Sequence, residues 1–223
     1  MKNKEGCVVS YDKALVSHKL LRWEHYLNNY RLPAWKELPD IGLYMDQVIA
    51  LLGQYLDFIP VEDMKNDKPV APTTINNYVR LKVMPAPEKR KYYRIHIAFL
   101  IMIFTLKQGA SISGLQQLLP APDASEEEVR TFYSDYIERL RSVCALYIDH
   151  VRNVAQEFLE PDDGGVEPET LVVQCILMSA LSRITGEKLL RLRGADPEKV
   201  LEQEKLNDER GLHPMIPPLD QEG

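Results

Sequence analysis

The sequence has few of the features that place a chain in a familiar class. It contains only three cysteines, Cys7, Cys144 and Cys175, and their odd number and wide spacing suit reduced thiols better than a disulfide framework. The longest uncharged apolar runs, Ile95–Leu106 and Thr170–Ser182, are shorter than the roughly 18–20 residues that span a bilayer. The N-terminus is charged and is not followed by the apolar core of a secretory signal. We therefore expect a cytoplasmic protein without a membrane segment.

Motifs for catalysis and metal binding are also missing. The five histidines are scattered, with no HExxH pattern and no cysteine at zinc-ligand spacing, and no GxxxxGK[ST] phosphate loop occurs. The run from Gly109 fails the GxSxG pattern because position 113 is Ser. Residues 162–165 lack the alternating ligands of a calcium loop and are predicted to form a turn. We expect no enzyme, no cofactor and no metal site; an enzyme without a recognisable motif is the remaining alternative.

Charge is distributed unevenly along the chain. The net charge is −6, but residues 1–122 hold 16 basic and 11 acidic side chains, and residues 123–223 hold 11 basic and 22 acidic ones. Between Arg80 and Arg94, six cations accompany the single acid Glu88. A basic spot on an acidic protein gives a directed attraction to phosphates. The alternative is a solvated charged loop.

Apolar spacing predicts an almost entirely helical chain. The expected helices cover residues 12–30, 39–59, 73–81, 95–107, 112–119, 126–158 and 169–192. Ser125 and Glu128 form a capping-box pattern at the start of the longest one. Pro60–Pro72 is expected to be a loop or linker, and residues 206–223 a disordered tail.

The two longest expected helices should form a hairpin. The second is apolar on nearly all sides between Leu171 and Leu181, so it needs cover from the first helix and from another element or subunit. The first helix carries three tyrosines, which could line a ligand pocket, although packing in the core or at a dimer seam is the preferred interpretation. These are Tyr133, Tyr136 and Tyr147.

The order of parts between residues 73 and 119 predicts a winged helix-turn-helix. Its short polar helix contains Asn76 and Asn77, although Asn is a poor residue inside a helix. Asn can bond bidentately to adenine in the major groove, while the basic loop 85–93 suits contacts to phosphates. The alternative is that both amides face water. The predicted DNA-binding residues are Thr73, Thr74, Asn76, Asn77, Tyr78, Arg80, Lys89, Arg90, Lys91, Tyr92 and Tyr93.

This segment resembles the MerR-type winged helix of bacterial regulators. TINNYVRLKVM (74–84) falls on that family's recognition-helix pattern TLRYYERIGLL, and GASISGLQQLL (109–119) falls on LGFSLEEIRELL. The chain departs from the family in four ways. Asn76 and Asn77 replace Arg and Tyr, so the family's base preferences do not carry over. Pro60–Pro72 replaces a short turn, which leaves the first helix of the motif unplaced. Lys82 replaces a Gly, which costs about 1 kcal/mol or more if it must be left-handed. The clustered cysteines of metal sensors are absent.

The chain as a whole resembles a bacterial family known as domain of unknown function 1836, through LPDIGLYMDQV (38–48) and INNYV (75–79). We expect an all-α protein with at most a small β wing. An N-terminal helical arm (1–37) precedes the winged helix (38–122), and residues 123–205 dimerise or sense a ligand. The expected function is a DNA-binding transcriptional regulator that binds double-stranded DNA as a homodimer through residues 123–192, with an unknown small-molecule effector. The alternative is a helical adaptor that binds another protein.

Overall fold

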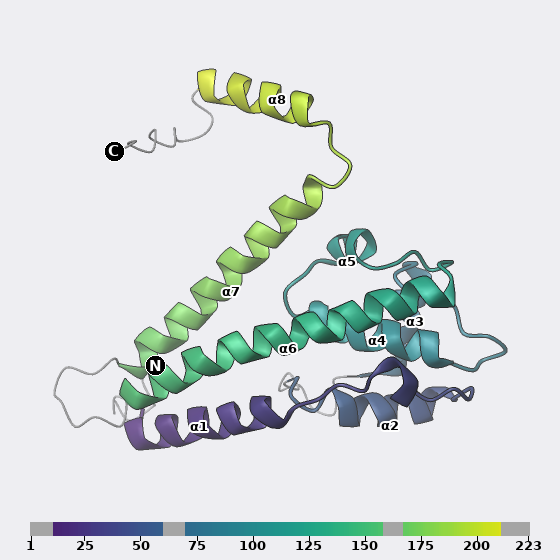
Figure 1. The fold of residues 1–223 in the computed structure, drawn as a ribbon, viewed down its shortest axis with the longest axis horizontal. Helices are drawn as coiled ribbons and strands as arrows, with labels where there is room; N and C mark the ends of the chain where they lie inside the picture. Colours follow the sequence, from purple (N-terminus) through teal and green to yellow (C-terminus); the bar gives the residue numbers. More distant parts are fainter. Residues whose placement is uncertain (1–10, 60–69, 158–166, 211–223) are drawn as a thin grey trace, which may run out of the picture.

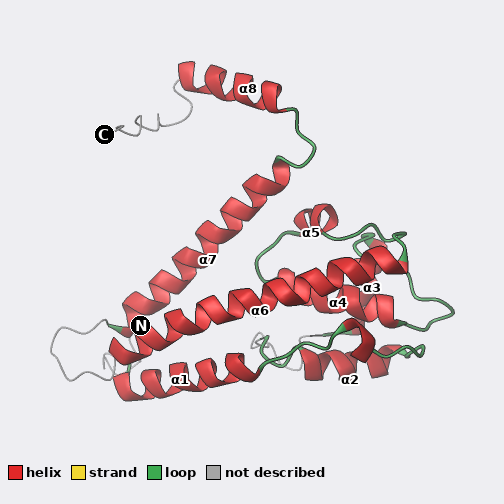
Figure 2. Ribbon diagram, in the orientation of Figure 1, coloured by secondary structure: helices red, strands yellow, loops and turns green. Residues whose placement is uncertain are grey.

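The computed structural model describes residues 11–59, 70–157 and 167–210 (Figure 1). These ranges are mainly helical, and Figure 2 shows no strand in them. The elements are α1 (Lys13–Asn29), the short 3-10 helix η1 (Trp35–Glu37), α2 (Met45–Tyr55), α3 (Pro72–Arg80), α4 (Arg94–Leu106), α5 (Ile112–Leu118), α6 (Glu126–Glu157), α7 (Pro168–Arg191) and α8 (Pro197–Glu209). The predicted all-α class is confirmed. None of these helices combines the length and apolarity needed to cross a bilayer.

The centre of the core is α4. Every residue from His96 to Phe104 is buried, and a helix that is apolar all round needs neighbours on several sides. Those neighbours include α2 and the N-terminal part of α6, which contributes Val129, Tyr133 and Ile137 to the same cluster. The predicted helix over residues 95–107 is therefore confirmed as α4.

The start of α6 matches the predicted capping box. The backbone N–H of Ser125 donates to Glu128 Oε2 at 2.8 Å, and the Ser125 hydroxyl donates to the same oxygen at 2.7 Å. The Glu128 N–H in turn donates to Ser125 Oγ at 3.3 Å. These bonds hold the pKa of the Glu128 carboxyl below its ordinary value.

Two of the three tyrosines on α6 pack into the core. The Tyr133 hydroxyl is buried and lies 2.9 Å from the backbone oxygen of Pro33, to which it donates. The Tyr136 hydroxyl lies 2.5 Å from Thr105 Oγ1, and burial raises the pKa of Tyr136 to about 12. Tyr147, by contrast, is exposed beside His150. The packing interpretation is confirmed for Tyr133 and Tyr136.

The N-terminal arm lies along α6 rather than apart from it (Figure 1). Asp12 caps α1 by accepting the Leu15 N–H at 2.9 Å. Farther along α1, the buried Ser17 hydroxyl donates to the backbone oxygen of Ala155 at 3.3 Å. The two helices are also joined by an ion pair at 2.8 Å between Glu24 and Arg152. The second half of α6 is thus covered by a helix that precedes it by more than a hundred residues.

The expectation that α6 covers one side of α7 is wrong. Figure 1 shows the two helices diverging, and the far end of α7 reaches α5. There, Arg193 donates a hydrogen bond to the backbone oxygen of Gln117. Within α7 itself, only Pro168 and Leu171 are buried. The apolar side chains between residues 172 and 189 are therefore exposed in a single copy of the chain.

Several expected segments lie wholly or partly outside the described residues. They are Cys7, residues 60–69 of the expected linker, the expected turn at 162–165 and residues 211–223 of the expected tail. The described part of that tail, up to Glu209, belongs to α8. The linker ends before Pro72, which is the first residue of α3.

Candidate nucleic-acid interface

One face of α3 is exposed and polar. Pro72 starts the helix, where its fixed φ is favourable and its missing N–H has no cost. Ile75 and Tyr78 turn into the core. The opposite positions, Asn76 and Arg80, are exposed, as is Thr73 in the first turn. Thr73, Asn76 and Arg80 are separated by three and four positions. They share this outer face because a helix turns every 3.6 residues.

The two asparagines of α3 have different surroundings. Asn77 is half-buried, and its Oδ1 accepts a hydrogen bond of 2.7 Å from Arg80 Nη2. The Asn76 side chain is exposed, and no hydrogen bond joins it to another described residue. Asn77 therefore orients the Arg80 guanidinium, while the Asn76 amide keeps its donors and its acceptor available for a ligand.

Lys82 ends α3 in a left-handed conformation, with φ 54°. The Lys82 N–H donates to Val79 O and the Val83 N–H to Tyr78 O, both at 3.0 Å, which is the Schellman pattern that usually carries Gly at this position. The sequence comparison anticipated this strain, which costs about 1–2 kcal/mol. The Gln116 side chain of α5 also donates to Leu81 O at 2.6 Å, a contact that the sequence did not indicate.

A two-residue hairpin turn presents two cations. Glu88 and Lys91 exchange backbone hydrogen bonds of 3.0 and 2.8 Å, and Lys89 and Arg90 between them have φ 49° and 66°. Positive φ at both central residues matches a type I′ turn, which favours Asn-Gly. Non-glycine residues held in this conformation are strained, and such strain is found mostly at functional sites. Both side chains are exposed.

The base of this hairpin is fixed to the chain before α2. Leu43 and Tyr92 exchange backbone hydrogen bonds of 2.8 Å in each direction. Gly42 allows the close approach, because a Cβ there would lie 2.9 Å from Lys91 Cδ and 2.9 Å from Tyr93 Cζ. Lys91 Nζ also lies 5.5 Å from the centre of the Tyr44 ring. This hairpin (residues 85–93), called the wing below, is therefore tied to the start of α2.

His96 joins the wing to α4. This buried side chain accepts the Tyr93 N–H at Nδ1 (3.0 Å), so its proton lies on Nε2, which donates to the Ala86 backbone oxygen at 2.9 Å. The sequence analysis grouped His96 with the scattered histidines. Its position three residues after the helix N-cap was the available signal, since a side chain there can reach back to the cap.

Two residues predicted to bind DNA are core residues instead. Tyr78 packs edge-on against Phe104, with the ring centres 5.7 Å apart, and Tyr92 packs in the same way against His96. Burial raises the pKa of both hydroxyls. Their rings stabilise α3 and the wing from behind, so they are corrected from DNA contacts to packing residues.

The other predicted residues reach the surface to different degrees. Thr73, Asn76, Arg80, Lys89 and Arg90 are exposed, and Thr74, Asn77, Lys91 and Tyr93 are half-buried. Arg94, the last of the six cations, supports the structure: its Nε donates to Leu38 O at 3.1 Å.

The segment that contains α2, α3, the wing, α4 and α5 also has a recognisable sequence. Residues 33–136 match the model of a family described as Domain of unknown function (DUF1836). The resemblance to that family is therefore confirmed over these residues, which end within α6 and exclude α1, α7 and α8. No curated protein and no solved structure matches the chain.

Proposed function

We propose that this protein is a sequence-specific, double-stranded DNA-binding transcriptional regulator that acts as a dimer. In this proposal α3 is the recognition helix of a winged helix-turn-helix, α2 is the first helix of the motif and residues 85–93 are the wing. The observation that carries the proposal is the pair of strained, exposed cations, Lys89 and Arg90, at the tip of a hairpin that follows a helix with an exposed polar face along the chain.

The chemistry of these side chains fits the two kinds of contact that DNA requires. The Asn76 amide offers a donor and an acceptor, the combination that bonds bidentately to the N6/N7 edge of adenine. Arg80, held by Asn77, and the wing cations suit phosphate oxygens, which fix the position of a protein but carry little sequence information. The acidic residues concentrated after residue 122 would repel DNA from the rest of the chain.

The resemblance to MerR-type regulators supports the same assignment. The order of a helix, a recognition helix, a wing, a helix pair and a long helix corresponds to α2, α3, the hairpin, α4 with α5, and α6. The insertion between α2 and α3 is longer than a MerR turn, yet α2 and α3 contact each other. The family's base preference does not transfer, because Asn76 and Asn77 stand where it has Arg and Tyr.

The dimer part of the proposal rests on α7. Its exposed apolar residues occur on all sides of the helix, and the outer face of α6 adds three more. On α7 they include Val173, Ile176, Leu177 and Leu181; on α6 they are Val143, Leu146 and Tyr147. In a two-fold dimer, the same surface of each copy faces the other copy. A second copy could therefore cover the exposed residues of both α6 and α7. Two copies would also suit recognition of two half-sites.

The direct test is retention of genomic DNA. Fragments of the source genome would be incubated with the full chain at low salt and separated by gel retardation, and the retained fragments sequenced. We expect a small set of fragments to be enriched, with an affinity that falls steeply as salt rises. If no fragment is retarded even at low salt, the regulator assignment is wrong.

A second function is favoured by the same exposed surface of α7. A helical adaptor would use this apolar face to bind another protein and would not need the wing cations. Two variants distinguish these functions. An adaptor should lose its partner protein when the apolar face of α7 is altered and keep it when Lys89 and Arg90 are replaced. A regulator should lose DNA binding when Lys89 and Arg90 are replaced.

A further inference from the structure

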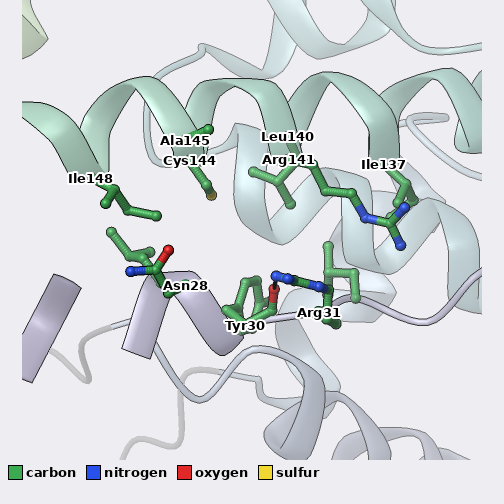
Figure 3. Close-up of a pocket in the computed structure, with 11 residues that line it drawn as sticks. Asn28, Tyr30, Arg31, Ile137, Leu140, Arg141, Cys144, Ala145 and Ile148 are labelled. Atoms are coloured by element: carbon green, nitrogen blue, oxygen red, sulfur yellow. Dashed lines mark hydrogen bonds between the residues drawn. The ribbon is translucent and has the colours of Figure 1, made fainter. Parts of the chain in front are cut away.

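A cavity of about 350 Å³ lies between the C-terminal end of α1 and the middle of α6 (Figure 3). Ligand pockets in proteins span roughly 300–1,000 Å³, so this one has room for a small organic molecule. Leu27, Leu140 and Ile148 supply apolar walls from the two helices. Arg31 and Arg141 line the same cavity, one from each side.

The lining is positively charged and contains no Asp or Glu. Arg31 Nη1 donates to the Tyr30 backbone oxygen at 2.7 Å, and no described carboxylate forms an ion pair with either arginine. Asp57, whose negative charge helps to raise the pKa of Tyr30, accepts a hydrogen bond from Tyr26 and does not line the cavity. Two guanidinium groups that face a half-apolar cavity create a site for a carboxylate, with which guanidinium forms paired, charge-assisted bonds.

We propose that this pocket binds an amphipathic carboxylate: a small acid whose carboxylate lies between Arg31 and Arg141 and whose hydrocarbon chain packs against Leu27, Leu140 and Ile148. The site lies outside the proposed DNA interface, and binding there does not depend on DNA binding. It is connected to the interface, however, because the Tyr30 hydroxyl donates to the Tyr55 backbone oxygen at 2.6 Å, at the end of α2. An occupant that shifts Tyr30 would act directly on that helix.

Cys144 makes the occupancy of this pocket measurable, because its thiol lines the cavity. Burial raises the pKa of the thiol, and the positive charge of Arg31 opposes the rise. A bound ligand would block access to the sulfur. In the full chain with Cys7→Ser and Cys175→Ser, Cys144 is the single remaining thiol, and its alkylation by iodoacetamide reports on this pocket and not on the apolar surface of α7.

The test measures the alkylation rate with octanoate, with the neutral analogue octan-1-ol and with the shorter hexanoate as probes. We expect octanoate to slow alkylation about tenfold at a concentration ten times its Kd, since only the empty fraction reacts. Octan-1-ol at the same concentration should give little protection. Each CH₂ that enters the apolar part should raise affinity about fourfold, so hexanoate should bind more weakly.

Variants separate the proposed site from non-specific binding of amphiphiles. Arg31→Gln with Arg141→Gln should abolish protection by octanoate, and Arg139→Gln, an exposed position on the same helix that is not part of the lining, should leave it unchanged. Arg141→Gln alone, which disturbs no hydrogen bond among described residues, covers the case in which the double variant fails to fold. Equal protection by octan-1-ol, or undiminished protection in Arg141→Gln, would overturn the proposal.

Discussion

Asn76 and Asn77 are adjacent in the sequence, but their side chains are not equivalent. Asn77 accepts a hydrogen bond from Arg80, while the Asn76 amide is exposed. The roles of the two asparagines cannot be distinguished from the sequence alone, because helical periodicity places both side chains near the outer face of the helix. Under the proposed function, this hydrogen bond makes Asn76 the candidate for the base contact and Asn77 a residue that positions Arg80.

Replacing Asn76 with Ala should therefore reduce specificity and leave general affinity nearly unchanged. We expect a loss of about 1–3 kcal/mol on the preferred site and little on random DNA, with almost the same dependence of affinity on salt. Replacing Lys89 and Arg90 with Ala should instead weaken binding to every duplex and reduce the slope of log affinity against log salt by roughly one per lost phosphate contact. Fluorescence anisotropy with both duplexes measures each effect.

The exposed cation Lys19 on α1 provides the control for these variants, since Lys19→Ala removes a charge outside α3 and the wing. If Asn76→Ala weakens specific and random DNA equally, α3 positions the protein and the base-contacting residues lie elsewhere.

The wing turn carries a cost in stability that can be removed. Lys89→Asn with Arg90→Gly gives the Asn-Gly pair that a type I′ turn prefers. We expect the free energy of unfolding to rise by about 1–2 kcal/mol per relieved residue, because neither new residue is strained at positive φ. DNA affinity should fall at the same time. Urea denaturation and anisotropy on the same variant measure the two changes. A variant that is no more stable than the parent would show that the turn is not strained.

At the scale of elements, the ends of the helices were predictable because local chemistry sets them. Ser125 and Glu128 begin α6, and Ser111 begins α5 by accepting the Gly114 N–H at 3.1 Å, as side-chain caps within three residues can. The burial of Tyr78 and Tyr92 was not predictable, since a tyrosine beside basic residues fits a surface and a core equally well. Tyr78 is buried against Phe104, which is distant in the sequence. Tyr92 is buried against His96, which belongs to α4.

The capping box of α6 should make stability depend on pH in a defined direction. The pKa of Glu128 is lower in the folded chain than in the unfolded chain, so its contribution is present above the unfolded pKa and is lost as pH falls through the folded one. Glu128→Gln should therefore be less stable than the parent near neutral pH, and the two should converge in acid. Urea denaturation between neutral pH and pH about 3 tests this. A difference that persists in acid would assign the effect to packing rather than to charge.

On the scale of the whole molecule, the exposure of α7 and the pocket beside α6 depend on packing between segments that are far apart in the sequence. The sequence indicated that α7 needs neighbours on several sides, but it could not show that α6 would diverge from it. The pocket was equally hidden, because it exists only where α1 docks on α6, between segments more than a hundred residues apart.

Charges placed on the exposed apolar face of α7 should dissociate the proposed dimer. We expect Ile176→Glu with Leu181→Glu to give a monomer by light scattering at tens of micromolar, where the parent is a dimer, since each buried carboxylate would have no partner. Ser182→Glu adds a charge on the same helix at an exposed polar position and should remain dimeric. A parent chain that is already monomeric at about 10–100 µM, where even weak dimers form, would exclude the dimer.

The docking of α1 on α6 also sets an order of events on the ribosome. Ser17 and its partner Ala155 are 138 residues apart. At about 5–20 residues per second, Ser17 is synthesised roughly 7–28 seconds before its partner Ala155. Residues 33–136, which contribute most of the core around α4, are synthesised within that interval. The α1–α6 layer, and the cavity within it, can therefore form only after α6 has been synthesised, long after α1.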